Sequence, residues 1–351
     1  MLPLEEARKR VEKLWKLFEP CRLCPRECGA RRAEGNVGVC GAGRQFRLAA
    51  WAAHRGEEPP ISGERGSGTI FASHCPMKCC FCQNYPFSQL GNGQDMEIDD
   101  LAEVFIKLAQ KGVHNLNFVT PTHFTPHLFD ALIRAYSPLQ EQSDISLKNA
   151  RQSRQFRPLP ETSPDIIPSV GIKTRAPTQI KNTFLVENLP IVYNTSGFES
   201  LEVLKLLDGM VDIYIPDIRY ADNAVGKQLS KVPDYVERDR AAILEMARQV
   251  GAAPIEYGPD GMARRGLIVR HLVLPGGLAG TASSLKWLRD TLGTQVAVSL
   301  MCQYFPAHLA PTLPGLDRAI TMEEYSEAVD LLDGMGFENA WAQDPDETGG
   351  A

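Results

Sequence analysis

A repeated strand-then-helix pattern runs through most of this 351-residue chain from Gly68 onward, and it constrains the fold more than any other feature. Short apolar runs typical of buried strands are each followed by a longer stretch with helical periodicity. The predicted strands are 69–73, 116–120, 191–195, 211–215, 267–274 and 296–301. The predicted helices are 99–111, 126–135, 198–207, 235–250, 281–292 and 321–335.

Six such units with nearly continuous apolar strands predict an α/β fold on a parallel sheet. Right-handed crossovers would curl this sheet, and six units are fewer than the eight of a closed barrel. We therefore expect a partial (β/α)6 TIM-like barrel over residues 67–345, with a doubly wound open sheet as the alternative. Residues 138–188 carry six prolines and no period, so they predict an inserted, disordered loop.

Residues 1–66 predict an N-terminal cysteine-rich module that opens with an amphipathic helix over 1–20. The N-terminus lacks the apolar region of a secretory signal, and no stretch approaches the roughly 18 apolar residues of a membrane helix. The net charge of −6 argues against a general nucleic-acid or anionic-membrane binder. We therefore expect a cytoplasmic protein that binds neither membrane nor nucleic acid.

Nine cysteines are the most informative part of the composition, because clustered cysteines in a reducing cytosol more often bind metal than form disulfides. They fall into two tight groups and one single residue: Cys21, Cys24, Cys28 and Cys40; Cys75, Cys79, Cys80 and Cys82; and Cys302. We expect Cys302, which lies at the end of the last predicted strand, to be a small buried hydrophobe.

The spacing Cys75-x3-Cys79-x2-Cys82, directly after a predicted strand, is the strongest chemical signal. A [4Fe–4S] cluster takes thiolate ligands, so three on one loop would leave one iron open to chelate a cofactor or substrate and pass it an electron. The alternative is a zinc knuckle or a buried cysteine cluster, with Cys80 or His74 as a fourth zinc ligand. We expect Cys80, between the ligands, to point away.

At this loop the sequence resembles the radical S-adenosylmethionine superfamily. The segments Gly66–Phe71, Cys82–Tyr85 and Arg270–Gly276 are similar to the branch of pyruvate formate-lyase activating enzymes. The resemblance implies that Cys75, Cys79 and Cys82 hold a [4Fe–4S] cluster whose free iron binds S-adenosylmethionine. It further implies that electron transfer breaks a carbon–sulfur bond and that the resulting 5′-deoxyadenosyl radical takes a hydrogen atom.

The substrate that the resemblance implies is a glycine on a partner enzyme, and a small molecule is equally compatible. A low-potential electron donor is implied as a second partner. A non-catalytic iron–sulfur electron-transfer protein and a zinc-stapled binding protein remain the alternatives to an enzyme.

Polar residues at the ends of the predicted strands are candidate cofactor contacts, because active sites of such folds lie at the carboxyl ends of the strands. Where the family often has Gly-Gly-Glu to receive the cofactor's amino group, this chain has Thr-Pro-Thr-His, so the Thr120 carbonyl or the Thr122 hydroxyl could substitute. The other candidates are Asn194, Ser196, Asp217 with Arg219, and His271 or its neighbour Arg270. Arg270 and His271 must face opposite sides of their strand. The alternative to a cofactor contact is that these residues cap loops and form hydrogen bonds within turns.

The first group, Cys21-x2-Cys24-x3-Cys28-x11-Cys40, supplies four thiolates and can therefore form a closed site. Zinc and a second iron–sulfur cluster both accept four thiolates, and the spacing does not separate them. Three interpretations of this group stay open: a structural zinc or iron site, an electron-relay cluster, or unbound thiols.

Overall fold

The computed structural model describes residues 2–136, 186–252 and 254–345, and it has a mixed α/β fold around a large central sheet. The strands are β1 (Phe46–His54), β2 (Ser67–Ala72), β3 (Gln94–Met96), β4 (Leu116–Val119), β5 (Ile191–Thr195), β6 (Ile213–Pro216), β7 (Glu256–Tyr257), β8 (Ala263–Leu272), β9 (Ala297–Met301) and β10 (Ala340–Ala342). The predicted insertion at 138–188 lies outside the described residues except for its last three positions.

Helices follow most of the parallel strands. They are α1 (Leu4–Phe18), α2 (Pro59–Ser62), α3 (Tyr85–Ser88), α4 (Ile98–Gln110), α5 (Thr125–Tyr136), α8 (Leu201–Leu207), α9 (Asn223–Ser230), α10 (Tyr235–Val250), α11 (Thr281–Leu292) and α12 (Met322–Gly334). Short 3-10 turns lie at η1 (Arg32–Glu34), η2 (Thr122–Phe124), η3 (Pro275–Gly277) and η4 (Ala310–Thr312). Within the described residues, no helix is both long and apolar enough to cross a membrane.

The sheet order is β10-β9-β8-β6-β5-β4-β2-β1-β3. The six strands predicted from the apolar runs are β2, β4, β5, β6, β8 and β9, and each pairs in parallel with the next. Every residue of β5 and β6 is buried, as expected for strands covered on both faces. Within the described part of the chain the two ends of the sheet, β3 and β10, do not pair, so the sheet is not closed.

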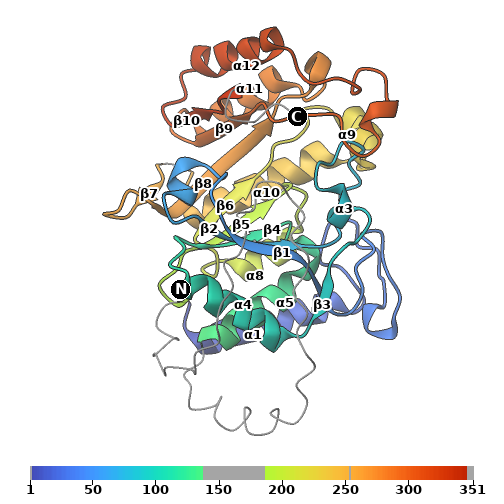
Figure 1. The fold of residues 1–351 in the computed structure, drawn as a ribbon, viewed down its shortest axis with the longest axis vertical. Helices are drawn as coiled ribbons and strands as arrows, with labels where there is room; N and C mark the ends of the chain where they lie inside the picture. Colours follow the sequence, from blue (N-terminus) through green and yellow to red (C-terminus); the bar gives the residue numbers. More distant parts are fainter. Residues whose placement is uncertain (1, 137–185, 253, 346–351) are drawn as a thin grey trace, which may run out of the picture.

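The N-terminal part of the chain joins this sheet directly. The amphipathic helix α1 buries Ala7, Val11, Leu14, Leu17 and Phe18, as its periodicity predicts. It lies with α4, α5 and α8 on one side of the strands (Figure 1). β1 pairs antiparallel with β2 and β3, so this strand of the predicted 1–66 module is part of the central sheet.

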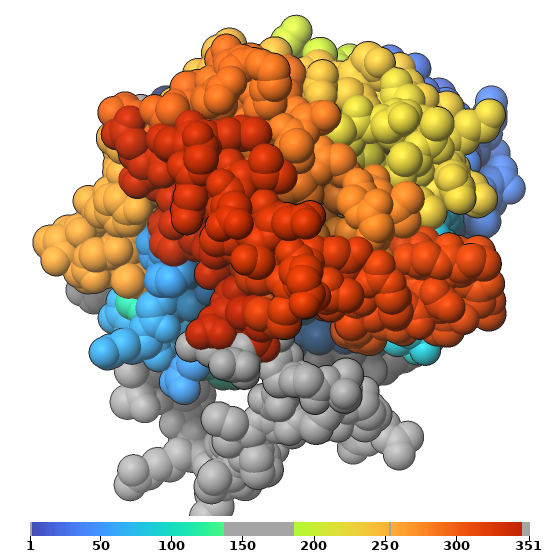
Figure 2. All heavy atoms as spheres, turned by 90° about the horizontal axis from the view of Figure 1, so that it is seen from above, coloured from blue at the N-terminus to red at the C-terminus, as the bar shows by residue number. Residues whose placement is uncertain are grey.

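The inner face of the parallel strands is filled by a segment from between β1 and β2. α2 places Ile61 in an apolar cluster with residues of the central strands, among them Val192, Ile213, Ile215 and Ile268. At the other end, the C-terminal residues, coloured orange to red, cover much of the face seen from above (Figure 2).

Candidate functional site

The cysteine loop, residues 73–82, follows β2 directly and is held by backbone hydrogen bonds from two distant segments. The Cys80 amide donates to the Leu229 carbonyl at 2.8 Å, at the end of α9. The Cys80 carbonyl accepts from the Leu309 amide at 2.8 Å. These bonds fix the loop between the end of α9 and the segment after β9.

Two of the three spaced cysteines accept or share hydrogen bonds through sulfur. Arg219 Nη1 and Ser230 Oγ each lie 3.0 Å from Cys79 Sγ and donate to it. Cys82 Sγ is hydrogen bonded to Ser88 Oγ at 3.1 Å. Donors placed on a sulfur stabilise its thiolate form, which is the form that binds metal.

The thiols of the loop lie close enough to influence one another. Burial raises the pKa of Cys75, and the neighbouring Cys79 and Cys82 raise it further. Burial and Cys79 likewise raise the pKa of Cys82. None of the nine cysteines forms a disulfide, and in the part of the chain that the structure describes, no three His, Cys, Asp or Glu side chains are gathered tightly enough to hold a metal as they stand.

The loop thiols nevertheless suit a soft metal. Three sulfurs share one loop, two of them are supplied with hydrogen-bond donors, and all three are free thiols in or against an apolar cluster. A metal that binds here must displace the protons that burial favours, so its affinity would depend on pH. Cys80 is buried in the same cluster, and its exclusion as a ligand stays a prediction.

Residues at the ends of β5 and β6 lie at the same edge of the sheet as the cysteine loop. The link is Arg219, which donates to Cys79 and forms an ion pair with Asp217. Burial works against the Arg219 charge, but Cys79 and Asp217 hold its pKa above the ordinary value. The structure thus brings the predicted Asp217 next to the cysteine loop through Arg219.

Asn194 and Ser196 lie at the end of the neighbouring strand and are both buried. Tyr235 joins this strand to Arg219, because its hydroxyl donates to the Ser196 carbonyl at 2.8 Å and accepts from the Arg219 amide. The Ser196 hydroxyl has no hydrogen-bond partner among the described residues. Such a buried, unpaired group is uncommon and is available to a ligand.

Thr120 and Thr122, which stand where the family's Gly-Gly-Glu would be, have different environments. Thr120 has a φ of 53°, a left-handed conformation that is unusual for a β-branched residue and typical of functional sites. Its amide donates to the Asn194 carbonyl at 2.9 Å. Thr122 is fully buried, and its hydroxyl donates to Glu199. Thr120 therefore stays available through its carbonyl, whereas the Thr122 hydroxyl is already paired.

Glu199 is a buried carboxyl group at this edge that the sequence analysis missed. It accepts hydrogen bonds from the hydroxyls of Thr122, Tyr193 and Thr195. Burial outweighs these bonds and raises the pKa of Glu199 to about 7. Its partners come from two segments of the chain, and only the folded structure brings them together.

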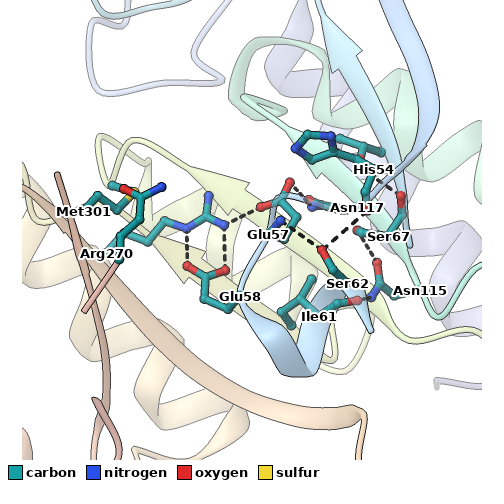
Figure 3. A network of polar contacts seen from close by, with 12 residues as sticks. His54, Glu57, Glu58, Ile61, Ser62, Ser67, Asn115, Asn117, Arg270 and Met301 are labelled. Carbon is teal, nitrogen blue, oxygen red and sulfur yellow. Dashed lines mark hydrogen bonds and ion pairs between the residues drawn. The ribbon is translucent and has the colours of Figure 1, made fainter. Parts of the chain in front are cut away.

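Arg270 and His271 face opposite sides of β8, as strand geometry requires. Arg270 points to the interior and pairs with Glu57 and Glu58, while Asn117 donates to Glu57 at 3.1 Å (Figure 3). Burial raises the pKa of Glu58, but the Arg270 charge and its hydrogen bonds outweigh this, so the pKa lies below its usual value. Arg270 thus anchors the segment that fills the inner face.

His271 packs on the other side of β8 and is fully buried. Its Nδ1 lies 2.7 Å from the Ile218 carbonyl and must donate to it, so its Nε2 accepts from the Thr281 hydroxyl at 3.0 Å. Both ring nitrogens are occupied by the fold. The structure therefore brings Arg270, and not His271, to the inner face, and the cofactor role of His271 stays a prediction without a free nitrogen to serve it.

The N-terminal cysteine set consists of Cys21, Cys24, Cys28 and Cys40. Three of its thiols are buried and Cys28 is exposed. Burial, together with the other three cysteines of the set, raises the pKa of Cys24 to about 12. The Ala42 amide lies 3.4 Å from Cys40 Sγ and donates to it. The four thiols are thus neighbours, and their chemistry fits zinc or an iron–sulfur cluster equally.

Comparison with known proteins gives no activity to transfer. No model of a known protein family matches the chain. A protein of Methanocaldococcus jannaschii named "Uncharacterized protein MJ0674" is 26% identical over 335 residues, which cover 92% of this chain and 77% of that protein. The similarity therefore extends over most of both chains and names no activity.

Proposed function

We propose that this protein is a radical S-adenosylmethionine enzyme whose Cys75, Cys79 and Cys82 hold a [4Fe–4S] cluster. The observation that carries the proposal is the placement of this triplet. It forms one loop after the first parallel strand, and hydrogen-bond donors from other elements reach two of its sulfurs. Three soft ligands on one loop suit a cluster that keeps one iron open.

The strand order supports the finer prediction of a partial (β/α)6 barrel. A doubly wound sheet reverses its order at a switch point, whereas the six parallel strands here follow one another in chain order without reversal. Right-handed crossovers between such strands curl a sheet toward a barrel. A partial barrel would leave one side open for a large substrate.

Bound together, the cluster and S-adenosylmethionine would supply reductive cleavage of a carbon–sulfur bond and, from it, hydrogen-atom abstraction. The chain's own part is to hold the thiolates and shield them. Arg219 and Ser230 stabilise the Cys79 thiolate by donating to its sulfur. Apolar residues surround the loop, including Phe81, Tyr304 and Leu316, and would exclude water from it.

The side chains that remain unpaired at the strand ends are the best candidates for cofactor contacts. The Ser196 hydroxyl has no partner among the described residues, and the Asn194 side chain forms no hydrogen bond within them. Thr120, in its left-handed conformation, offers a carbonyl where the family's amino-group contact would be. Asp217 holds Arg219 against Cys79 and could also accept from a hydroxyl group.

We also propose that the N-terminal cysteine set forms a second, closed metal site for zinc or iron. We further propose a low-potential one-electron donor as partner, a cytoplasmic location, and as substrate either a glycine on a partner protein or a small molecule. The identity of the substrate rests on the sequence resemblance alone.

Anaerobic reconstitution with iron and sulfide, followed by reduction in the presence of S-adenosylmethionine, tests the proposal. We expect iron bound at the loop and formation of 5′-deoxyadenosine. Iron-loaded protein that never cleaves the cofactor would instead indicate an electron carrier. Protein that takes up zinc at the loop and excludes iron would indicate a zinc-stapled binding protein.

A further inference from the structure

The segment that leads from β4 into the first turn of α5, residues 121–127, contacts the backbone next to both cysteine sets. His123 Nε2 lies 2.7 Å from the carbonyl of Ser73, the first residue of the cysteine loop. A carbonyl can only accept, so His123 carries its proton on Nε2 and donates it. His123 lies in the segment that stands where the family often has Gly-Gly-Glu. It therefore holds the backbone two positions before Cys75.

The same segment holds the N-terminal cysteine set from the other side. His127 Nε2 donates to the Arg44 carbonyl at 2.8 Å, four residues after Cys40. Arg32, which lies in the chain between Cys28 and Cys40, donates from Nε to the Gly43 carbonyl at 2.9 Å and from Nη1 to the His123 carbonyl at 2.7 Å. A continuous path of hydrogen bonds thus runs from Gly43 through Arg32 and His123 to Ser73.

This path is buried and cannot be replaced by water at little cost. Arg32 is 0% exposed and His123 is 1% exposed. The Arg32 guanidinium carbon lies 4.3 Å from the Phe18 ring centre and 5.0 Å from that of Phe124, so aromatic faces enclose the charge. Breaking one of these buried hydrogen bonds would leave an unsatisfied polar group away from water, so the path is costly to disrupt.

His123 makes its contact as a neutral ring. Burial lowers the pKa of His123 and of His127 to about 3, which outweighs the hydrogen bonds that each makes to a carbonyl. The Nδ1 of each ring has no hydrogen-bond partner among the described residues. The one bond from Nε2 is therefore the only polar contact that orients each ring, and its proton does not titrate near neutral pH.

We propose that His123 is a positioning residue through which metal binding at the N-terminal cysteine set fixes the backbone of the cysteine loop. The bonds by which Arg32 holds Gly43 and His123 carry the effect from one set to the other. This inference rests on the proposed function only in treating the N-terminal set and the loop as metal sites. Supporting groups of this kind typically change metal affinity about 10–100-fold when removed.

Hydrogen exchange of the loop amides tests the link without iron or S-adenosylmethionine. Cys75, Cys79 and Cys82 are replaced by serine in the full chain, so that added zinc can occupy only the N-terminal set. We expect zinc to slow exchange over residues 73–82 by about fivefold to tenfold, the effect of about one hydrogen bond. Adding His123→Phe should abolish this slowing while zinc still binds.

Two further variants make the result specific. His123→Gln keeps a nitrogen donor at a similar reach and should restore most of the slowing. His114→Phe removes a histidine whose contacts are to Arg65 and should leave the slowing intact. Thermal melting followed by circular dichroism shows that each variant is folded, and alanine replaces serine at Cys75, Cys79 and Cys82 if the serine variant fails to fold.

Equal slowing in the His123→Phe variant, or none in the protein with His123, would overturn the inference. Failure of the N-terminal set to bind zinc would overturn it as well. Each of these outcomes leaves the radical chemistry of the proposed function untouched, and that chemistry fails instead if the intact loop takes no iron or if bound iron never cleaves the cofactor.

Discussion

The two cysteine sets differ in where their supporting contacts come from. Cys79 in the loop receives donors from Arg219 and Ser230, which are 140 and 151 residues away in the chain. Cys40 in the N-terminal set receives its donor from Ala42, two residues away. The donors to the Cys79 sulfur thus come from distant segments, whereas the donor to the Cys40 sulfur is local.

This difference matches the chemistry that each set can perform. Four thiols with local support suit a closed site whose role is to hold the chain together. Three thiols held by distant groups suit a site whose geometry must be set by the whole fold, because the open position has to meet a cofactor in a fixed orientation. The comparison teaches that replacing a distant donor to a sulfur should weaken metal binding at the loop and leave metal binding at the N-terminal set unchanged.

The largest effect is expected from Cys79→Ala. Two thiolates hold a cluster poorly, so iron at the loop and cofactor cleavage should both be lost, while metal at the N-terminal set stays. Iron analysis and the yield of 5′-deoxyadenosine measure the two effects. Cys80→Ala is the matched control and should keep both; if that variant loses its loop iron, Cys80 is a ligand and the triplet has been assigned wrongly.

Cys24→Ala tests the other side of the comparison. Loss of a structural metal site should lower the free energy of unfolding by about 4 kcal/mol or more. Chemical denaturation under anaerobic conditions measures this change, with Cys302→Ala as a control outside both sets. A variant of unchanged stability whose loop cluster is reduced more slowly would show that the N-terminal set relays electrons.

Glu199, near the cysteine loop, should make the stability of the fold depend on pH. Its pKa rises from an ordinary 4.5 to about 7 on folding. Below pH 4.5 it is protonated in both states, and between 4.5 and 7 only the unfolded chain loses the proton. The contribution of Glu199 to the free energy of unfolding should therefore fall by up to about 3 kcal/mol as the pH rises from 4.5 to about 7, and stay level at higher pH.

Urea unfolding from pH 5 to pH 8 checks this expectation against Glu199→Gln, which is neutral at every pH and can still accept hydrogen bonds. The difference between the two proteins isolates the carboxyl group from the pH dependence of the metal sites. If the two proteins show parallel curves, then Glu199 is not held neutral in the folded state.

A smaller effect is expected from Arg219→Met, which removes a donor to Cys79 and the partner of Asp217. The affinity of the loop for metal should fall about 10–100-fold, as it does when a supporting group is removed. Arg219→Lys should recover part of this affinity because it restores the charge. Titration with cobalt, followed through its thiolate absorption, measures both; weakened binding at the N-terminal set instead would erase the contrast between the sets.

The parallel core of the fold could be predicted because its strands are apolar on both faces. Runs such as Ile191–Thr195 are buried throughout, so composition alone marks them. β3 and β10 have only three residues each, and β1 contains several alanines, so their sequences carry little strand signal. Their place in the sheet comes from pairing that a single sequence does not reveal.

The candidate site could be predicted in part. The spacing of the cysteines identified the triplet as candidate metal ligands. The ends of the predicted strands identified Asn194, Ser196 and Asp217 as candidate cofactor contacts. Side chains alternate along a strand, so Arg270 and His271 were predicted to face opposite sides of theirs. The sequence did not show which of the two faces inward, because that depends on Glu57 and Glu58, more than 200 residues earlier in the chain. Glu199 and His123 act through partners from separate segments, so only the folded chain shows their roles.

Electron paramagnetic resonance of the anaerobically loaded and reduced protein, recorded before and after addition of S-adenosylmethionine, tests the central claim most directly. An open iron at the cysteine loop predicts a shifted spectrum, because the cofactor would bind the cluster itself. In Cys79→Ala protein the shifting signal should be absent, and any signal from the N-terminal set should stay unchanged. An unshifted spectrum from fully iron-loaded protein would contradict an open site at Cys75, Cys79 and Cys82.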